Sequence, residues 1–116
     1  MSIAVKICGL TTPATLIAAV CGGAQFVGFV FYPRSPRFIL IERATSLAMM
    51  VPKTVKRVGL FVDPPLDDLG ALLARVPLDM IQLHGSESPE LISEVRRRFA
   101  LPVIKAIAVQ DASDLR

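Results

Sequence analysis

The chain has 116 residues, of which 53% are hydrophobic, and its formal net charge is +3. This length allows one domain with a buried core and is too short for two, so we expect a single domain over residues 1–116. The apolar content excludes an intrinsically disordered chain. The modest charge, without a basic stripe interleaved with aromatic residues, argues against a nucleic-acid partner.

The longest stretch without a charged residue lies between Lys6 and Arg34. Polar residues and Pro13 interrupt it, so no run reaches the ~18 unbroken apolar residues that a membrane-spanning helix needs. Pro13 also falls where the apolar part of a signal peptide would lie. We therefore expect a cytoplasmic protein that does not bind a membrane.

Cys8 and Cys21 are the two cysteines, and they form no CxxC motif, which fits a reducing compartment. With the single histidine, His84, they do not make a convincing metal site, and we expect no metal. Taken alone, a cysteine is more often a packing residue than a functional one, and we expect Cys21 to pack in the core.

Five short runs rich in β-branched and aromatic residues predict strands, with helical stretches between them. In chain order, the strands are expected at 4–8, 26–31, 56–62, 79–85 and 102–109, and the helices from Pro13 to Gly22, at about 42–51, at 66–76 and at 89–99. Thr12 before Pro13 predicts a capped helix start, and Ser88 before Pro89 repeats that arrangement. Strands that alternate with helices indicate βαβ units and a parallel sheet.

Two architectures fit this pattern. A doubly wound open sheet of five strands suits a chain of this length, whereas a complete eight-unit barrel needs ~200 residues or more. The strands recur about every 24 residues, so the chain would supply about four and a half units of such a barrel.

Side-chain alternation favours the barrel. If alternate residues share a face, a mixed polar set falls on one face: Lys6, Cys8, Phe61, Asp63, Gln82, His84 and Lys105. The opposite face is then apolar: Val5, Ile7, Leu60, Val62, Ile81 and Leu83. An open sheet covered by helices on both sides would be apolar on both faces, while a barrel has one face under helices and one directed inward.

Several polar residues lie at or near the carboxyl ends of these strands, where ligands bind in parallel α/β folds. Cys8, Asp63 and His84 lie at or next to the ends of three predicted strands, and the loop YPRSPR after the second strand adds Arg34 and Arg37. Prolines stiffen that loop.

Five segments together resemble the phosphoribosylanthranilate isomerase family of tryptophan biosynthesis: KICGLT at 6–11, GFVFYPRSPR at 28–37, VGLFVD at 58–63, QLHG at 82–85 and PVIKA at 102–106. The resemblance runs along essentially the whole chain, in order. It implies a (β/α)8 barrel, here a partial one. It also implies an isomerase that converts N-(5-phosphoribosyl)anthranilate to 1-(2-carboxyphenylamino)-1-deoxyribulose 5-phosphate by an Amadori rearrangement, without a cofactor.

The same resemblance implies roles for individual residues. Cys8 would be the general base that removes the proton from sugar C2, and Lys6, on the same strand face, would be a nearby positive charge that favours the thiolate. Arg37 would hold the anthranilate carboxylate, for which a bidentate guanidinium is the natural partner. His84 would position the substrate, and Asp63 would be a weaker substrate-binding candidate. Lys105 is weaker still, with an expected place deeper in the barrel.

The family mechanism also needs a general-acid aspartate on a later strand and glycine-rich phosphate-binding loops after the last two strands. Asp111 and Asp114 come too early for the general acid, so we expect the missing groups beyond Arg116 and the chain to be inactive alone. The alternative is a noncatalytic half-barrel that associates through its exposed edges, and an open-sheet phosphate-binding domain is a third option.

Overall fold

The computed structural model describes residues 6–105, over which β-strands and α-helices alternate. The strands are β1 (Lys6–Cys8), β2 (Phe26–Val30), β3 (Lys56–Phe61), β4 (Met80–Leu83) and β5 (Val103–Lys105), and the helices are α1 (Pro13–Cys21), α2 (Ile41–Met49), α3 (Leu66–Leu73) and α4 (Pro89–Phe99). The predicted fifth strand continues to residue 109, and that part, with Asp111 and Asp114, lies outside the described residues. No helix within residues 6–105 is long and apolar enough to cross a bilayer.

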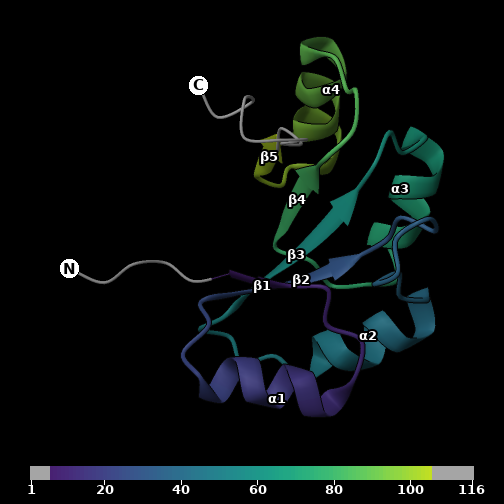
Figure 1. The fold of residues 1–116 in the computed structure, drawn as a ribbon. Helices are drawn as coiled ribbons and strands as arrows, with labels where there is room; N and C mark the ends of the chain where they lie inside the picture. Colours follow the sequence, from purple (N-terminus) through teal and green to yellow (C-terminus); the bar gives the residue numbers. More distant parts are fainter. Residues whose placement is uncertain (1–5, 106–116) are drawn as a thin grey trace, which may run out of the picture.

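All described strand pairs are parallel, and the order in the sheet is β1-β2-β3-β4-β5. A doubly wound sheet reverses its strand order at a switch point, and this sheet does not, so the partial barrel is the architecture that forms. Figure 1 shows α1, α2, α3 and α4 following one another around the outside of the curved sheet.

One hydrophobic core lies between the sheet and this layer of helices. Each helix contributes at least one fully or almost fully buried side chain: Leu16, Leu47, Leu69 and Val95. They belong to the same cluster as strand residues Val27, Phe29, Phe61, Ile81 and Leu83. Burying each such side chain contributes about 1.5–3 kcal/mol, so this packing holds the helices against the sheet.

Both predicted helix starts are confirmed. The hydroxyl of Thr12 accepts a hydrogen bond from the backbone N–H of Thr15 at 3.2 Å, and Ser88 Oγ accepts one from the N–H of Leu91 at 3.1 Å. Each interaction satisfies an N–H group that the first turn of a helix leaves unpaired. Cys21, expected in the core, is exposed instead, because it is the last residue of α1.

The face assignment of the third strand was wrong by one residue. Leu60 is in register with Val30 and Gln82, on the face directed to the barrel interior, whereas Phe61 is in register with Leu83 and packs in the core. Asp63 misled the prediction, because it lies beyond the end of β3 with a φ of 45° and does not follow the strand alternation.

The placement of Lys105 needs the same correction. Lys105 is in register with Leu83, so it belongs to the helix-facing side at the end of β5 rather than to the mixed face. Gln82 pairs with Ile104, which takes the inward face of β5 instead.

Candidate active site

A cavity of about 500 Å³ lies at the carboxyl ends of β1 to β4, on the inward face of the sheet. It brings together three of the predicted site residues, Cys8, Arg37 and His84. Its remaining walls are Val30, Tyr32, Ser35, Pro36, Leu60 and Val62. A nucleophilic sulfur, a guanidinium and an imidazole thus face one space with a largely apolar wall, an arrangement typical of a binding site for a small molecule.

Cys8 is the last residue of β1 and is partly exposed. Its partner in the sheet is Gly28 of β2, so the space beside the thiol holds no side chain. A Cβ atom built on Gly28 would lie 2.8 Å from Cys8 Sγ. The strand pairing therefore leaves the sulfur room at this position on the inward face.

Arg37 reaches the cavity from the loop between β2 and α2. Turns hold this loop: the N–H of Ser35 donates to the carbonyl of Tyr32 at 3.0 Å, and the N–H of Arg37 donates to Ser35 Oγ at 3.1 Å. The aliphatic part of the Arg37 side chain lies over Gly9. Within the described residues the guanidinium forms no ion pair, so its hydrogen-bond donors are available to an anionic ligand.

His84 directly follows β4, and its backbone N–H donates to the carbonyl of Phe61 at 2.9 Å. Its Nδ1 atom is buried and has no hydrogen-bond partner among residues 6–105. Unpaired buried polar atoms are rare in folded proteins and mark positions that a ligand or water can complete. In the same part of the chain, no group of three or more His, Cys, Asp or Glu side chains is arranged to hold a metal ion.

Lys6 does not line the cavity. It lies two residues before Cys8 on the inward face, and its Nζ donates a hydrogen bond to Gln82 Oε1. The ammonium group in this strand is therefore hydrogen-bonded by an amide oxygen from β4, three strands away in the sheet.

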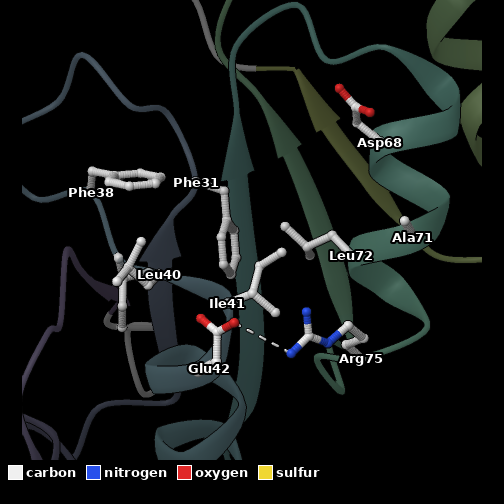
Figure 2. Close-up of a pocket in the computed structure, with 10 residues that line it drawn as sticks. Phe31, Phe38, Leu40, Ile41, Glu42, Asp68, Ala71, Leu72 and Arg75 are labelled. Carbon is white, nitrogen blue, oxygen red and sulfur yellow. Dashed lines mark ion pairs between the residues drawn. The ribbon is translucent and has the colours of Figure 1, made fainter.

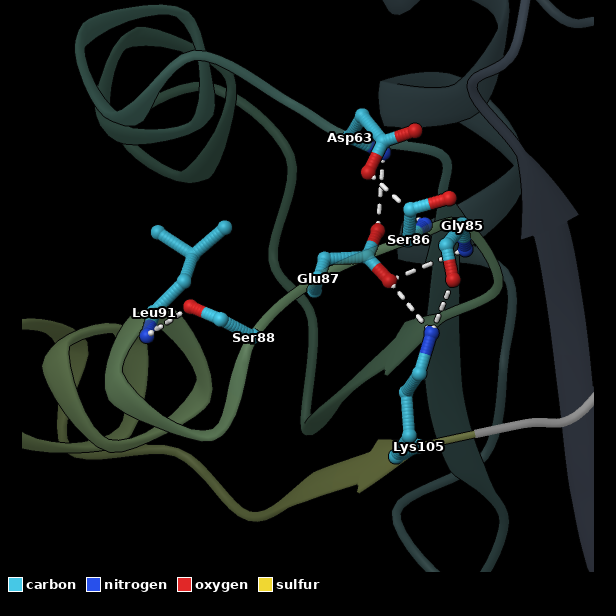
Figure 3. Close-up of polar contacts among 7 residues, drawn as sticks. All are labelled: Asp63, Gly85, Ser86, Glu87, Ser88, Leu91 and Lys105. Carbon is cyan, nitrogen blue, oxygen red and sulfur yellow. Dashed lines mark hydrogen bonds and ion pairs between the residues drawn. The ribbon is translucent and has the colours of Figure 1, made fainter.

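Asp63 and Lys105 lie in a separate polar network built around Glu87 (Figure 3). The Glu87 carboxylate accepts hydrogen bonds from the backbone N–H of Asp63 at 2.7 Å and of Gly85 at 2.9 Å, and from Lys105 Nζ at 2.6 Å. Lys105 Nζ also donates to the Gly85 carbonyl, and Asp63 Oδ1 accepts from the N–H of Ser86 at 2.9 Å. These contacts join the loops after β3 and β4 to the end of β5.

The Glu87 side chain is completely buried, with 0% of its surface exposed. Burial by itself would raise the pKa of this carboxyl, but the hydrogen bonds from Lys105 and from the backbone N–H groups outweigh it and lower the pKa below its usual value. Glu87 therefore remains charged in the interior, and its charge fixes the geometry of both loops.

Sequence reasoning missed Glu87. The residue follows the QLHG segment in a loop, where an acidic side chain is most often solvent-exposed. The only signal in the sequence was one acidic residue at position 87 and one basic residue at position 105. They contact each other only because β4 and β5 are neighbours in the sheet.

A second ion pair lies at the opposite end of the sheet and was also missed. Arg57 and Asp79 form two side-chain contacts, from Nε to Oδ2 at 3.0 Å and from a terminal nitrogen to Oδ1 at 3.2 Å. Burial would raise the pKa of Asp79, yet hydrogen bonds from the Arg57 side chain and backbone lower it overall. This pair ties the start of β3 to the turn before β4 and is distant from the cavity that holds Cys8.

Another hollow of about 500 Å³ lies on the helix side, between α2 and α3 (Figure 2). Its walls include the apolar side chains of Phe31, Ile41 and Leu72, and the polar side chains Glu42 and Arg75 pair with each other at 3.5 Å. None of the predicted site residues lines this hollow, so the inward cavity is the better candidate active site.

A family model described as N-(5'phosphoribosyl)anthranilate (PRA) isomerase matches residues 5–116. The N-(5'-phosphoribosyl)anthranilate isomerases of Paracoccus denitrificans and Rhodospirillum centenum are 55% and 52% identical to this chain over 115 residues. Each alignment covers 99% of this chain and 54% of the relative, so the chain spans about half the length of these relatives.

Solved structures agree with these matches. The phosphoribosyl anthranilate isomerase of Thermotoga maritima superposes with a TM-score of 0.89 at 38% identity, covering 98% of this chain and 55% of that chain. An isomerase in complex with reduced 1-(o-carboxyphenylamino)-1-deoxyribulose 5-phosphate gives the same TM-score and identity, covering 98% of this chain and 58% of that chain. The chain therefore belongs to the phosphoribosylanthranilate isomerase family.

Proposed function

We propose that this chain carries the proton-abstracting and carboxylate-binding half of a phosphoribosylanthranilate isomerase active site. The observation that supports this most strongly is the convergence of Cys8, Arg37 and His84 on one cavity at the carboxyl ends of the strands. In the proposed reaction, N-(5-phosphoribosyl)anthranilate rearranges to 1-(2-carboxyphenylamino)-1-deoxyribulose 5-phosphate in the cytoplasm, as a step of tryptophan biosynthesis.

Cys8 is the proposed general base. After the sugar ring opens to the protonated imine, the thiolate takes the proton from C2, and the resulting enolamine tautomerises to the aminoketose. Removal of a carbon-bound proton needs a base held against that atom by a rigid element. The position of Cys8 at the end of β1, partly exposed to the cavity, meets this requirement.

Arg37 and His84 are the proposed substrate-binding groups. The unpaired guanidinium of Arg37 suits a bidentate contact with the anthranilate carboxylate. The imidazole of His84 lines the same cavity and can form a hydrogen bond with the substrate there. The carboxyphenylamino ligand in the related isomerase carries the same kind of carboxylate.

Lys6 and Asp63 remain weaker assignments. Lys6 is proposed to act on the thiolate through its positive charge, from its place two residues before Cys8. Asp63 is proposed to contact the substrate from the loop after β3, although its carboxylate already accepts a hydrogen bond from Ser86. The general acid and the phosphate-binding loops are proposed to come from later strands, so the chain alone is expected to be inactive.

The test is to join this chain to the part of the Paracoccus denitrificans relative that follows the matched region, a fusion called here the completed barrel. The loss of anthranilate-type fluorescence with phosphoribosylanthranilate measures turnover. We expect activity in the completed barrel, a loss of about 10³-fold or more with Cys8→Ala, and a raised KM with Arg37→Lys. Cys21→Ala serves as the matched cysteine control and should retain activity.

Unchanged turnover with Cys8→Ala would remove Cys8 from the mechanism. A completed barrel that is folded but does not turn over phosphoribosylanthranilate would contradict the proposed function as a whole.

A noncatalytic assembly module is the second candidate. Within the described residues, β1 and β5 each pair on one side only, and Ile7 and Ile104 on these strands are 38% and 39% exposed. Such edges favour association with another chain. Size-exclusion chromatography of the 116-residue chain, read together with the assay of the completed barrel, distinguishes the two candidates. A stable dimer of the chain alone combined with a folded but inactive completed barrel would favour the module.

A further inference from the structure

We propose that two glycines, Gly28 and Gly9, are positioning residues that set where the Cys8 sulfur and the Arg37 guanidinium lie in the cavity. Neither glycine lines the cavity that holds Cys8 and Arg37. Each leaves a space that a neighbouring functional side chain fills, and a direct hydrogen bond joins the two. The inference rests on the proposed function for its catalytic consequences and on packing geometry for the positions themselves.

Gly28 sets the position of the thiol. It is the β2 residue in register with Cys8, and a Cβ atom at residue 28 would lie 2.8 Å from Sγ, 3.3 Å from Cα and 3.5 Å from Cβ of Cys8. Non-bonded carbon and sulfur atoms do not approach to 2.8 Å without displacement. Because the backbone of Cys8 is held in the parallel ladder, the group that must move is the sulfur, by rotation about χ1.

Gly9 sets the position of the Arg37 stem. A Cβ atom at residue 9 would lie 2.2 Å from Cδ, 3.1 Å from Cγ and 3.2 Å from Cβ of Arg37. Gly9 also has a φ of +80°, a backbone conformation that other residues rarely adopt. A side chain here would therefore strain the turn after β1. It would also displace the aliphatic part of Arg37, which packs against Gly9.

Hydrogen bonds couple the two positions. The Gly28 carbonyl accepts from the N–H of Gly9 at 3.0 Å and from the N–H of Leu10 at 3.3 Å. This contact holds the turn that directly follows Cys8, so the thiol and the Arg37 stem are placed by the same short piece of backbone. The result is a base and an anion-binding group held in a fixed relation on rigid elements, which proton abstraction requires.

Two other glycines provide matched controls. Gly59 is also a strand glycine whose Cβ atom would clash, at 2.5 Å from Leu78 Cδ1, but these two residues do not line the candidate active site. Gly23 also has a positive φ, of +92°, and nothing lies within 4 Å of a Cβ atom there. Gly59→Ala thus reproduces a clash in the sheet, and Gly23→Ala reproduces the backbone strain, without contact to Cys8 or Arg37.

Steady-state kinetics of the completed barrel test the catalytic consequence. We expect Gly28→Ala to lower kcat about 10²-fold with little change in KM, because a base displaced by about 1 Å loses its alignment. Gly9→Ala should mainly raise KM, because it displaces the carboxylate-binding group. Changes in kcat and KM per folded molecule that are no larger than those caused by Gly59→Ala and Gly23→Ala would overturn the catalytic consequence.

Two readouts do not depend on activity. Mass spectrometry after brief iodoacetamide treatment gives the alkylation rate of Cys8 relative to the exposed Cys21 in the same molecule. We expect Gly28→Ala to change this ratio by about threefold or more and Gly59→Ala to leave it unchanged. In a double-mutant cycle, Gly28→Ala should shift the unfolding equilibrium about fivefold less when residue 8 is alanine, because the clash with Sγ is then absent.

An unchanged alkylation ratio together with additive effects on unfolding would overturn the positioning of the thiol by Gly28. If Cys8→Ala leaves turnover intact, the proposed base fails, yet the alkylation and unfolding measurements still decide whether Gly28 places the sulfur. The two claims can therefore fail separately.

Discussion

Replacing Glu87 with glutamine tests whether the buried network holds the loops above the sheet. The carboxylate accepts from three donors, two through Oε1 and one through Oε2. A glutamine side chain has one acceptor oxygen, so its amide group must face at least one of these donors. If its oxygen serves Lys105 and Gly85, the buried N–H of Asp63 loses its partner.

The magnitude follows from these contacts. Leaving one buried N–H without an acceptor costs about 1–3 kcal/mol. Loss of the charge opposite Lys105 adds about 1 kcal/mol, a modest value because 30% of the Lys105 side chain is exposed to solvent. We expect Glu87→Gln to lower the free energy of unfolding by about 3 kcal/mol at pH 7.

Urea unfolding of the completed barrel, followed by far-UV circular dichroism, measures this loss. With a slope of about 3 kcal/mol per molar urea, the midpoint should fall by about 1 M. Glu90→Gln, which removes an exposed carboxylate at the start of α4, is the control and should leave the midpoint nearly unchanged.

The pH dependence gives an independent check. The pKa of Glu87 is lower in the folded protein than in an unfolded glutamate, whose pKa is ~4.3. Its contribution is therefore complete above that unfolded value and is lost as the pH falls through the folded pKa. The difference between the parent protein and Glu87→Gln should narrow in acid. A difference below about 0.5 kcal/mol at pH 7, or one that does not change on acidification, would refute the reasoning.

Three further changes in the same protein have expected outcomes in urea unfolding. Asp79→Asn should lower the free energy of unfolding by about 1–2 kcal/mol, since it removes the charge from a half-buried bidentate pair with Arg57. Because the pKa of Asp79 is lowered in the folded protein, this loss should become smaller in acid. Ser88→Ala should cost about 1 kcal/mol by leaving the N–H of Leu91 uncapped. Ala100→Gly should raise stability by about 0.5–1 kcal/mol, because Ala100 ends α4 with a φ of 54° that glycine adopts without strain.

Two of these changes have a control elsewhere on the chain. Asp67→Asn removes an acid whose side chain is 95% exposed and whose 3.5 Å contact with Arg98 is screened by solvent, so it should cost no more than about 0.5 kcal/mol. Ser93→Ala, on the exposed surface of the same helix as the Ser88 cap, should be neutral or slightly stabilising. A loss with Asp79→Asn or Ser88→Ala that is no greater than that of its control, or a destabilised Ala100→Gly protein, would contradict the corresponding account.

Much of the fold could be predicted because its signals are local. The hydroxyl-proline pairs at 12–13 and 88–89 mark helix starts through contacts within one turn, and both starts are where they were expected. The apolar side of the helix that begins at Leu66 was equally visible. The choice between barrel and open sheet depended on strand faces, and the observed strand order supports the barrel.

The face of the sheet on which each β3 residue lies could not be predicted from local sequence. Leu60 and Phe61 are both apolar, so hydrophobicity alone did not distinguish their faces, and the one polar guide, Asp63, lies beyond the strand. The register with Val30 and Leu83 settles the question. For the candidate site, the grouping of Cys8 and His84 could be predicted because both follow parallel strands whose carboxyl ends meet at one edge.

By itself, the amino-acid sequence determined the alternation of strands and helices, the two capped helix starts and the family resemblance, because each depends on residues close together in the chain or on motifs read in order. The tertiary structure alone decided that Glu87 is buried beside Lys105, that Lys6 meets Gln82, and that glycines stand where Cys8 and Arg37 need space. These are contacts between residues far apart in sequence, and they exist only once the strand register has brought their side chains within a few ångströms of each other.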